Sequence, residues 1–193
     1  YFNAVNIQVT IINKGWNSSS AYASYLIWMQ NDATLRFLAS SNGSSWDIAN
    51  EKVMGTMTSG SWMHIAVTRS GTTFRAFVNG VINDSFTFTS SASLANIAAQ
   101  TLFIGDRTNG DTSLNGYISN ARIVNGTAVY TSTFTPSTTP LTAITNTSLL
   151  TCQTVVPQTT SVFVDESSAN NSITRNGNTN IGTFSPLNGS WSN

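Results

Sequence analysis

The stretch W-M-H-I-A-V-T-R-S-G-T-T-F-R-A-F-V-N-G, residues 62–80, decides the fold of this chain. Its first half alternates, so that residues 62, 64, 66 and 68 lie on one side of a strand and residues 63, 65, 67 and 69 on the other. One of these faces is apolar and the other is mixed, as in a sheet that covers a core. The pair Asn79-Gly80 predicts a two-residue type I′ turn, because both positions of that turn need a positive φ. The stretch therefore predicts a strand followed by a β-hairpin.

Similar β-rich runs, separated by turn residues, extend over the whole chain. Gly, Asn, Ser and Thr interrupt it at intervals of about 8–12 residues, which is typical of antiparallel β structure, and seven Asn-Gly pairs indicate reversals of the chain. No long stretch keeps the apolar period of roughly 3.6 residues expected of a helix. The predicted fold class is all-β, an antiparallel β-sandwich. The predicted strands cover residues 5–13, 21–30, 34–39, 45–49, 62–69, 73–79, 81–87, 101–104, 116–124, 148–153 and 162–164.

The composition is poor in charge. The 193 residues include eight Lys or Arg and eight Asp or Glu, so charged residues make up 8% of the chain and the net charge is zero. An average soluble protein contains roughly 25% charged residues. Because there is no excess of cations to contact phosphates, direct nucleic-acid binding is excluded. A hydrophobic fraction of 40% indicates a real core rather than a disordered chain, and no run approaches the roughly 18 apolar residues of a membrane span.

The C-terminal third differs in composition from the rest. Residues 131–147 are rich in Thr and Ser and contain Pro136 and Pro140, which predicts a long surface crossover. The apolar runs after it, 149–150 and 162–164, are too short to build a second core. Residues 1–193 are therefore interpreted as a single β-sandwich module, and a domain linker at 131–147 is the alternative.

Residues 62–80 resemble the laminin-G-like, concanavalin-A-like jelly-roll family, whose members carry a Trp, a His two residues later, an alternating strand and a second strand ending in V-N-G or Y-N-G. The blocks L-F-I-G-D (102–106) and L-N-G-Y-I-S-N-A-R-I-V-N-G (114–126) resemble the closing element of that family. Asn120 stands where the family more often has Asp, which weakens the transfer of a charge-based role. The resemblance implies a jelly-roll sandwich, a fold that hosts lectins, glycosidases and adhesion modules alike.

The segment A-V-Y-T-S-T-F-T-P, residues 128–136, is similar to repeats in structural and adhesion proteins of tailed phages, especially marine phages of cyanobacteria. This resemblance implies a virion protein that contacts other virion subunits and forms homo-oligomers, with three-fold packing as in phage fibres. Tandem members often end in W-S-N and begin in Y-F-x-G, and this chain ends in W-S-N and begins with Y-F-N. The resemblance therefore implies a module of a larger or tandem-repeat protein.

Glycoside hydrolysis is the natural enzymatic hypothesis for this fold, and it needs two carboxyl groups about 5–5.5 Å or 6.5–9.5 Å apart. Glucanases of the fold carry both on one strand as E-x-D-x-E, a motif that this chain lacks. Glu51 and Glu166 are its only glutamates, and Asp165 and Glu166 would face opposite sides of a strand. His64, the only histidine, lies in a strand pattern where a packed side chain is expected. The prediction is that the chain is not an enzyme.

The loop G-D-R-T-N-G-D-T-S-L-N-G, residues 105–116, contains the candidate metal ligands Asp106, Asn109, Asp111 and Asn115. Calcium takes about six to eight oxygen ligands and accepts amide and backbone carbonyls, and many laminin-G-like modules bind calcium at a sheet rim. A polar hairpin loop without metal is the alternative, because Asn, Asp and Gly are the usual residues of turns. Calcium is the one candidate cofactor, since one His and one Cys do not favour zinc.

Three aromatic residues, Trp16, Tyr22 and Trp46, lie near loops rich in Asn and Ser. Together with Asn42 they are the candidate residues of a glycan-binding site, in which aromatic faces pack on sugar rings and amides bind hydroxyl groups. Packing in the core is the alternative, because jelly rolls bury aromatic side chains between their sheets.

The predicted function is a non-enzymatic structural or adhesion module of a phage virion, of the capsid-decoration or tail-fibre type, which mediates assembly or contact with a host surface. The alternative is a carbohydrate-binding, calcium-dependent domain of a secreted or surface bacterial protein. The expected location is the virion, or else the extracellular space or cell surface. The expected partners are other subunits of the assembly, further copies of this chain and a host-surface glycan.

Overall fold

The computed structural model describes residues 1–4, 7–15, 23–97, 100–107, 112–153, 163–182 and 184–187. Within these ranges all regular structure is β, which confirms the predicted fold class. The described residues also contain no helix with the length and apolar character needed to cross a membrane. The strands are β1 Val9–Lys14, β2 Tyr25–Met29, β3 Thr34–Ala39, β4 Ala49–Thr56, β5 Ile65–Ser70, β6 Thr73–Val78, β7 Val81–Ile82, β8 Phe88–Thr89, β9 Leu102–Ile104, β10 Ala121–Val124 and β11 Thr147–Thr151.

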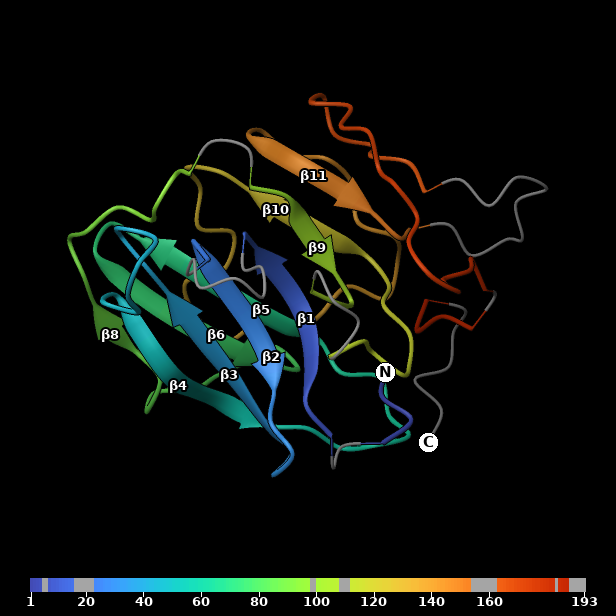
Figure 1. Ribbon diagram of the computed structural model, residues 1–193, viewed down its shortest axis with the longest axis horizontal. Coiled ribbons are helices and arrows are strands. Elements are labelled where there is room, and N and C mark those ends of the chain that lie inside the picture. The colour runs from blue at the N-terminus through green and yellow to red at the C-terminus, as the bar shows by residue number, and fades with distance from the viewer. Residues whose placement is uncertain are drawn as a thin grey trace.

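Two antiparallel sheets form a sandwich (Figure 1). The first, called the front sheet, has the strand order β4-β3-β2-β1-β9. The second, called the back sheet, has the order β5-β6-β7, and β8 also pairs with β6. In Figure 1 the blue and cyan strands β1 to β4 lie in front of β5 and β6. Strands β10 and β11 pair with each other in a separate two-stranded sheet at the top of that view.

The core between the sheets follows from the alternation of side chains along the strands. Met29 of β2 and Phe37 of β3 point inward, and Phe74 of β6 faces them, with the ring centroids of Phe37 and Phe74 6.2 Å apart. In β5, Ile65 and Val67 pack against the same core. The odd-numbered positions of the 62–69 pattern are therefore the inner face of the back sheet.

The predicted hairpin turn is confirmed. Asn79 has a φ of 50° and Gly80 a φ of 77°, the two positive values that a type I′ turn requires. On either side of the turn, Val78 of β6 pairs with Val81 of β7. The local Asn-Gly signal thus fixes the register of this hairpin.

The strand predicted over residues 81–87 is too long, because β7 ends at Ile82. Asn83 turns the chain away from β6: its Oδ1 accepts the Ser85 N–H at 3.0 Å, and its Nδ2 donates to the Met54 carbonyl of β4 at 2.9 Å. The same side chain therefore ends β7 and ties the back sheet to the edge of the front sheet.

The strand predicted over residues 45–49 is wrong, since β4 begins only at Ala49 and continues to Thr56. Asn42 Oδ1 accepts the backbone N–H of Ser44 at 2.7 Å and of Ser45 at 3.0 Å, so these groups belong to a turn. A further predicted strand, 162–164, is absent at residues 163 and 164, and residue 162 lies outside the described residues. There a side chain, that of Asp165, takes the place of a strand backbone and accepts the Leu150 N–H of β11 at 2.9 Å.

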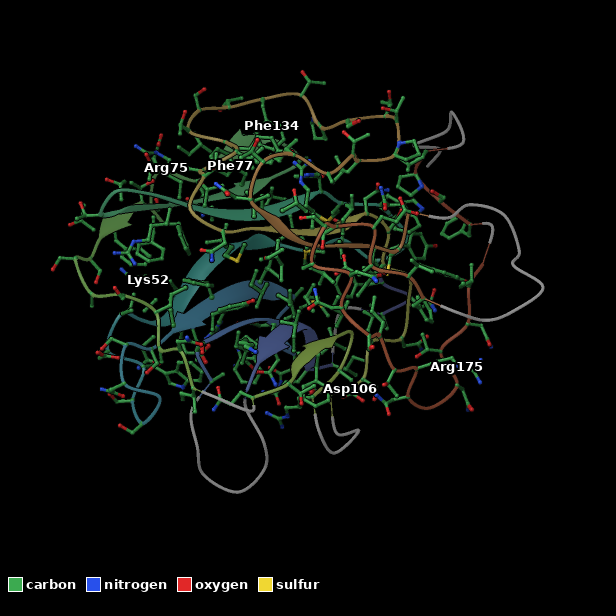
Figure 2. All side chains as sticks on the ribbon, turned by 90° about the horizontal axis from the view of Figure 1, so that it is seen from above. Lys52, Arg75, Phe77, Asp106, Phe134 and Arg175 are labelled. Atoms are coloured by element: carbon green, nitrogen blue, oxygen red, sulfur yellow. The ribbon has the colours of Figure 1, made fainter. Side chains whose placement is uncertain are left out.

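The connection from β10 to β11, residues 125–146 and here called the crossover segment, covers the outer face of the back sheet. The Phe134 N–H donates to the Gly80 carbonyl at 2.9 Å, and Thr68 Oγ1 donates to the Tyr130 carbonyl at 2.7 Å. Figure 2 shows Phe134 beside Phe77 of β6 on this side of the molecule. Phe77 is fully buried although it points away from the core. Residues 131–146 carry no strand and are mostly exposed, and β11 begins at residue 147.

We expect Gly80→Ala to destabilise the fold more than Gly71→Ala. Both glycines have a positive φ, 77° and 58°, which costs an alanine roughly 1–2 kcal/mol. At Gly80 the added Cβ would also lie 2.0 Å from the Phe134 carbonyl oxygen, whereas at Gly71 nothing lies within 4 Å. Forcing this contact apart should cost a further ~1–3 kcal/mol. Urea unfolding of the two variants measures the difference, and equal midpoints would show that the crossover segment does not pack on the hairpin.

Candidate functional site

The outer face of the front sheet carries a group of apolar side chains. Alternation turns Leu26 and Trp28 of β2 outward, and Leu38 of β3 lies beside them. These three are buried, and Trp46 from the loop over residues 40–48 packs on them while staying partly exposed. This group, called the front-face cluster, contains Leu26, Trp28, Leu38 and Trp46. It makes this sheet apolar on both of its faces.

Two of the four candidate glycan-binding residues, Trp46 and Asn42, lie in the same loop of residues 40–48. The amide of Asn42 holds this loop together, because its Oδ1 accepts from Ser44 and Ser45 and its Nδ2 donates to Ser45 Oγ at 3.0 Å. Asn42 is exposed and Trp46 is partly exposed. Trp16 and Tyr22 lie outside the described residues. A glycan site here stays a prediction.

A charged group lies on the same face of the front sheet. Arg36 of β3 pairs with Trp28 of β2 across the sheet, and its guanidinium binds two carboxylates: Asp32 at 2.8 Å and Glu51 of β4 at 3.1 Å. The hydrogen bond from the Thr34 hydroxyl, with further help from Arg36, lowers the pKa of Asp32. Both carboxylates therefore share one cation. Sequence reasoning missed this arrangement, because it depends on a bulged pairing of β3 and β4.

The described candidate calcium ligands, Asp106 and Asn115, are engaged in separate local contacts. The carboxylate of Asp106 accepts the Arg107 N–H at 2.6 Å and the Ser113 hydroxyl at 2.8 Å. Asn115 Oδ1 accepts from Asn3 Nδ2 at 2.7 Å. The other two candidates, Asn109 and Asp111, lie outside the described residues. In the part of the chain that is described, no three His, Cys, Asp or Glu side chains form a group that could hold a metal. Calcium binding stays a prediction.

His64 lies under the crossover segment. Its ring centroid is 5.9 Å from that of Tyr130 and 5.3 Å from that of Phe134, both at nearly right angles. Burial, and secondly the nearby charge of Arg122, lower the pKa of His64. Its Nδ1 is buried and has no hydrogen-bond partner among the described residues. The geometry gives a neutral, packed imidazole that the crossover segment covers.

Sequence reasoning also missed a second aromatic group. The rings of Tyr1, Trp62, Tyr117 and Phe184, called the Tyr117 cluster, all contact one another with centroids 4.9–6.3 Å apart. Tyr117 is 43% exposed and Phe184 47% exposed. The sequence feature that pointed to it is the pair Gly116-Tyr117, which was predicted only to be part of the strand over residues 116–124. The cluster is a partly exposed aromatic surface separate from the front-face cluster.

Asp165 is a buried carboxylate whose role is structural. It accepts the backbone N–H groups of Leu150, Ser167 and Asn171, each at 2.9 Å. The Ser167 hydroxyl donates at 2.9 Å and Asn171 Nδ2 at 2.6 Å. Burial alone would raise the pKa of Asp165, but these hydrogen bonds outweigh burial and hold the pKa far below its usual range. The carboxylate thus fastens the segment after residue 163 to β11.

Asp165→Asn should destabilise the fold by about 3 kcal/mol at pH 7, because an amide N–H then faces buried donors. Glu166→Gln, its exposed neighbour, should change stability by less than about 0.5 kcal/mol. Since folding lowers the pKa of Asp165, its contribution is complete above the unfolded pKa of about 3.9 and declines as the pH falls below it. Urea unfolding at pH 7 and pH 3 tests this. The gap between wild type and Asp165→Asn should shrink at pH 3, and a gap that stays constant would contradict the assignment.

Comparison with known proteins identifies the family. The model of Laminin_G_3, in the concanavalin A-like lectin/glucanases superfamily, matches residues 3–132. No curated protein and no solved structure matches the chain. The matched residues span β1 to β10 and thus both sheets of the sandwich. The match covers well over half of the chain, and the antiparallel sheets agree with it. The chain therefore belongs to the Laminin_G_3 family of the concanavalin A-like lectin/glucanase superfamily and has its jelly-roll β-sandwich fold.

Proposed function

We propose that this chain is a non-catalytic contact module of a virion, which joins subunits or attaches the particle to a host surface. The observation that supports this best is the structural use of its titratable groups. Asp32 and Glu51 both bind Arg36, Asp165 accepts five hydrogen bonds, and His64 is covered by aromatic rings. These groups hold loops and strands in place. Their structural roles favour binding, rather than catalysis, as the function of the surface.

Hydrolysis of a glycoside would need a different electrostatic arrangement. The general acid must keep its proton near neutral pH, so its pKa has to be raised. The carboxyl groups of Asp32 and Glu51 instead flank the guanidinium of Arg36, which pairs with Trp28 across the sheet. The pKa of Asp32 is lowered, first by the hydrogen bond from Thr34. The lowered pKa of Asp32 favours its ionised form, which supports a non-catalytic role.

The sheet edges favour contacts through faces and loops. The edge strand β4 has two register shifts against β3, and Glu51 within it has a φ of 52°. Such bulges, together with the charges of Glu51 and Lys52, hinder the addition of a further strand. The opposite edge, β9, has only three residues. The net charge of zero adds little repulsion between copies. Association of copies would therefore use the loops and outer faces.

The virion location rests on the resemblance of residues 128–136 to repeats of tailed-phage proteins. In the fold, this segment packs on the stretch that carries the family resemblance: Phe134 contacts His64, and the Tyr130 carbonyl accepts the Thr68 hydroxyl. The two stretches thus form one packing unit. That association supports treating the phage-like segment as part of the module rather than as an appended tail.

The purified chain should form homo-oligomers that persist at high salt, because their contacts would involve few charges. It should also release no reducing ends from polysaccharides. Light scattering after size exclusion and a reducing-sugar assay are the two measurements. A chain that stays monomeric at every concentration would argue against the assembly role. Release of reducing ends that Glu51→Gln abolishes would overturn the non-catalytic assignment.

A second candidate function is carbohydrate binding, which the front-face cluster favours. Trp46 is partly exposed above the buried Trp28, on the same face as the charged group of Arg36. An aromatic surface beside polar groups is suited to a sugar ring, whose C–H bonds pack on the aromatic face while its hydroxyls form hydrogen bonds. If binding depends on a metal, the polar loop after β9 would hold the calcium ion.

Under this second candidate, binding on a glycan array should fall at least tenfold in Trp46→Ala. A chelator should have the same effect if calcium bound at residues 106–115 takes part. Trp46→Phe is the matched control, because it keeps an aromatic face, and it should retain most of the signal. Equal binding by Trp46→Ala and wild type would rule out the front-face cluster as the glycan site.

A further inference from the structure

The crossover segment is attached to the back sheet by a small set of contacts. Among the described residues, three hydrogen bonds join it to the strands and the turn beneath it: Thr68 Oγ1 to the Tyr130 carbonyl at 2.7 Å, the Phe134 N–H to the Gly80 carbonyl at 2.9 Å, and the Ile82 N–H to Thr133 Oγ1 at 3.3 Å. Residues 131–146 form no strand, so their backbone lacks the ladder of bonds that protects a sheet. A segment of this kind opens at a lower cost in free energy than the sheets do.

The rest of the attachment is aromatic. The rings of Tyr130 and Phe134 stack with their centroids 3.6 Å apart, and both contact Phe77, at 6.2 and 5.4 Å. Phe77 is fully buried, so lifting these two rings would uncover it. The imidazole of His64 contacts the same two rings, at 5.9 and 5.3 Å between centroids. One titratable side chain therefore lies directly under the aromatic part of the attachment.

The backbone of His64 is fixed to the hairpin turn between β6 and β7. Its N–H donates to Asn79 Oδ1 at 2.9 Å, and its carbonyl accepts the Asn79 N–H at 2.8 Å. The residue also directly precedes β5. Because the sheet and the turn hold His64 from below, an unfavourable contact of its ring is relieved most easily by movement of the crossover segment above it.

A proton on His64 would add a positive charge that has no counterion nearby. In the charged form both ring nitrogens are donors, and the buried Nδ1 has no acceptor among the described residues. The charged group that acts on the imidazole is a cation, Arg122 of β10. By alternation Arg75 of β6 is on the same outer face as Phe77, and it is also a cation. The crossover segment contributes only the neutral phenol of Tyr130. Residues 61–83 and 117–153 contain no Asp or Glu.

The direction of the pH effect follows from these surroundings. Burial, and secondly the charge of Arg122, lower the pKa of His64 in the closed form. The opened imidazole has the ordinary pKa of about 6.5, so opening takes up a proton. The closed form is therefore fully favoured above about pH 6.5 and is favoured less as the pH falls below this value. Between pH 7.5 and pH 5.0 the equilibrium can move toward the open form by at most about 30-fold, the factor by which protonation stabilises the opened imidazole.

We propose that His64 is a pH-sensitive switch: protonation of its imidazole in mild acid releases the crossover segment and uncovers the apolar outer face of the back sheet around Phe77. At neutral pH the protein presents the Thr- and Ser-rich crossover segment on this side, and in acid it presents an apolar sheet face. The inference goes beyond the proposed function, because it concerns a change of conformation and involves no ligand. It therefore holds for either candidate function.

The test is hydrogen exchange of the full chain at pH 7.5 and pH 5.0, with each rate divided by the intrinsic rate at that pH. Both values lie above the range in which the carboxylate of Asp165 gains a proton, so the two pH effects are separate. In wild type, the protection of the Phe134 N–H should fall at least fivefold from pH 7.5 to pH 5.0. The amides of β2 and β3, which the crossover segment does not cover, should change less than twofold.

His64→Phe is the matched control, because it keeps an aromatic ring under the crossover segment and does not titrate. Its protection at Phe134 should differ less than twofold between the two pH values. His64→Leu serves as the second non-titrating variant if His64→Phe does not fold. Arg122→Gln removes the nearby cation, which is one of the two causes of the lowered pKa. This variant should therefore show a smaller fall in protection than wild type.

Constant or greater protection of the crossover segment in acid would overturn the inference, since the two aromatic rings would then accommodate the imidazolium. A fall in protection that persists in His64→Phe would contradict it as well, because another group would be responsible. A parallel loss of protection in β2 and β3 would show that the whole sandwich opens in acid, and that result too would exclude a switch confined to this segment.

Discussion

Each sheet of the sandwich bears apolar side chains on both faces, and this constraint determines where the loops lie. Phe77 of β6 and Leu26 of β2 are both fully buried, although both point away from the core between the sheets. Leaving side chains of this size in water would cost about 1.5–3 kcal/mol each. The crossover segment covers the back sheet, and Trp46 covers part of the front sheet. These loops are therefore part of the folding unit, and their positions create the surfaces that a partner meets.

Local signals in the sequence predict the regular parts of this fold. The run at 34–39 and the pair Asn79-Gly80 lead directly to β3 and to the hairpin. Prediction fails where a side chain replaces the backbone as hydrogen-bonding partner. Asn42 Oδ1 accepts the backbone N–H groups of a Ser-rich run, so these groups form no sheet hydrogen bonds. Asp165 accepts the Leu150 N–H of β11, which a neighbouring strand would otherwise accept. The Tyr117 cluster cannot be predicted from the sequence for another reason. It joins residues 116 positions apart, and a local sequence pattern carries no information about such a long-range contact.

The scarcity of charge has a structural counterpart. Several of the few charged groups bind within the protein: Arg36 bridges two carboxylates, Arg122 donates to the Thr142 carbonyl at 3.1 Å, and Asp165 is buried. Serine, threonine and asparagine make up about 40% of the chain and supply much of the polar surface. Such a surface interacts over short distances through hydroxyls and amides. Recognition by this protein therefore depends on shape and hydrogen bonding more than on long-range attraction.

The Asn-Gly turns also set how the protein ages. Asparagine followed by glycine deamidates readily, because the glycine nitrogen can attack the side-chain amide, and each event replaces a neutral group with a carboxylate. The amide oxygens of Asn42 and Asn79 accept backbone hydrogen bonds, from Ser44 and His64 respectively, which hold these side chains in one orientation and slow ring closure. In the exposed turn at Asn176 the side chain makes only a long contact of 3.5 Å with the Thr174 carbonyl. In a chain with no net charge, deamidation at Asn176 would add a negative charge to that turn.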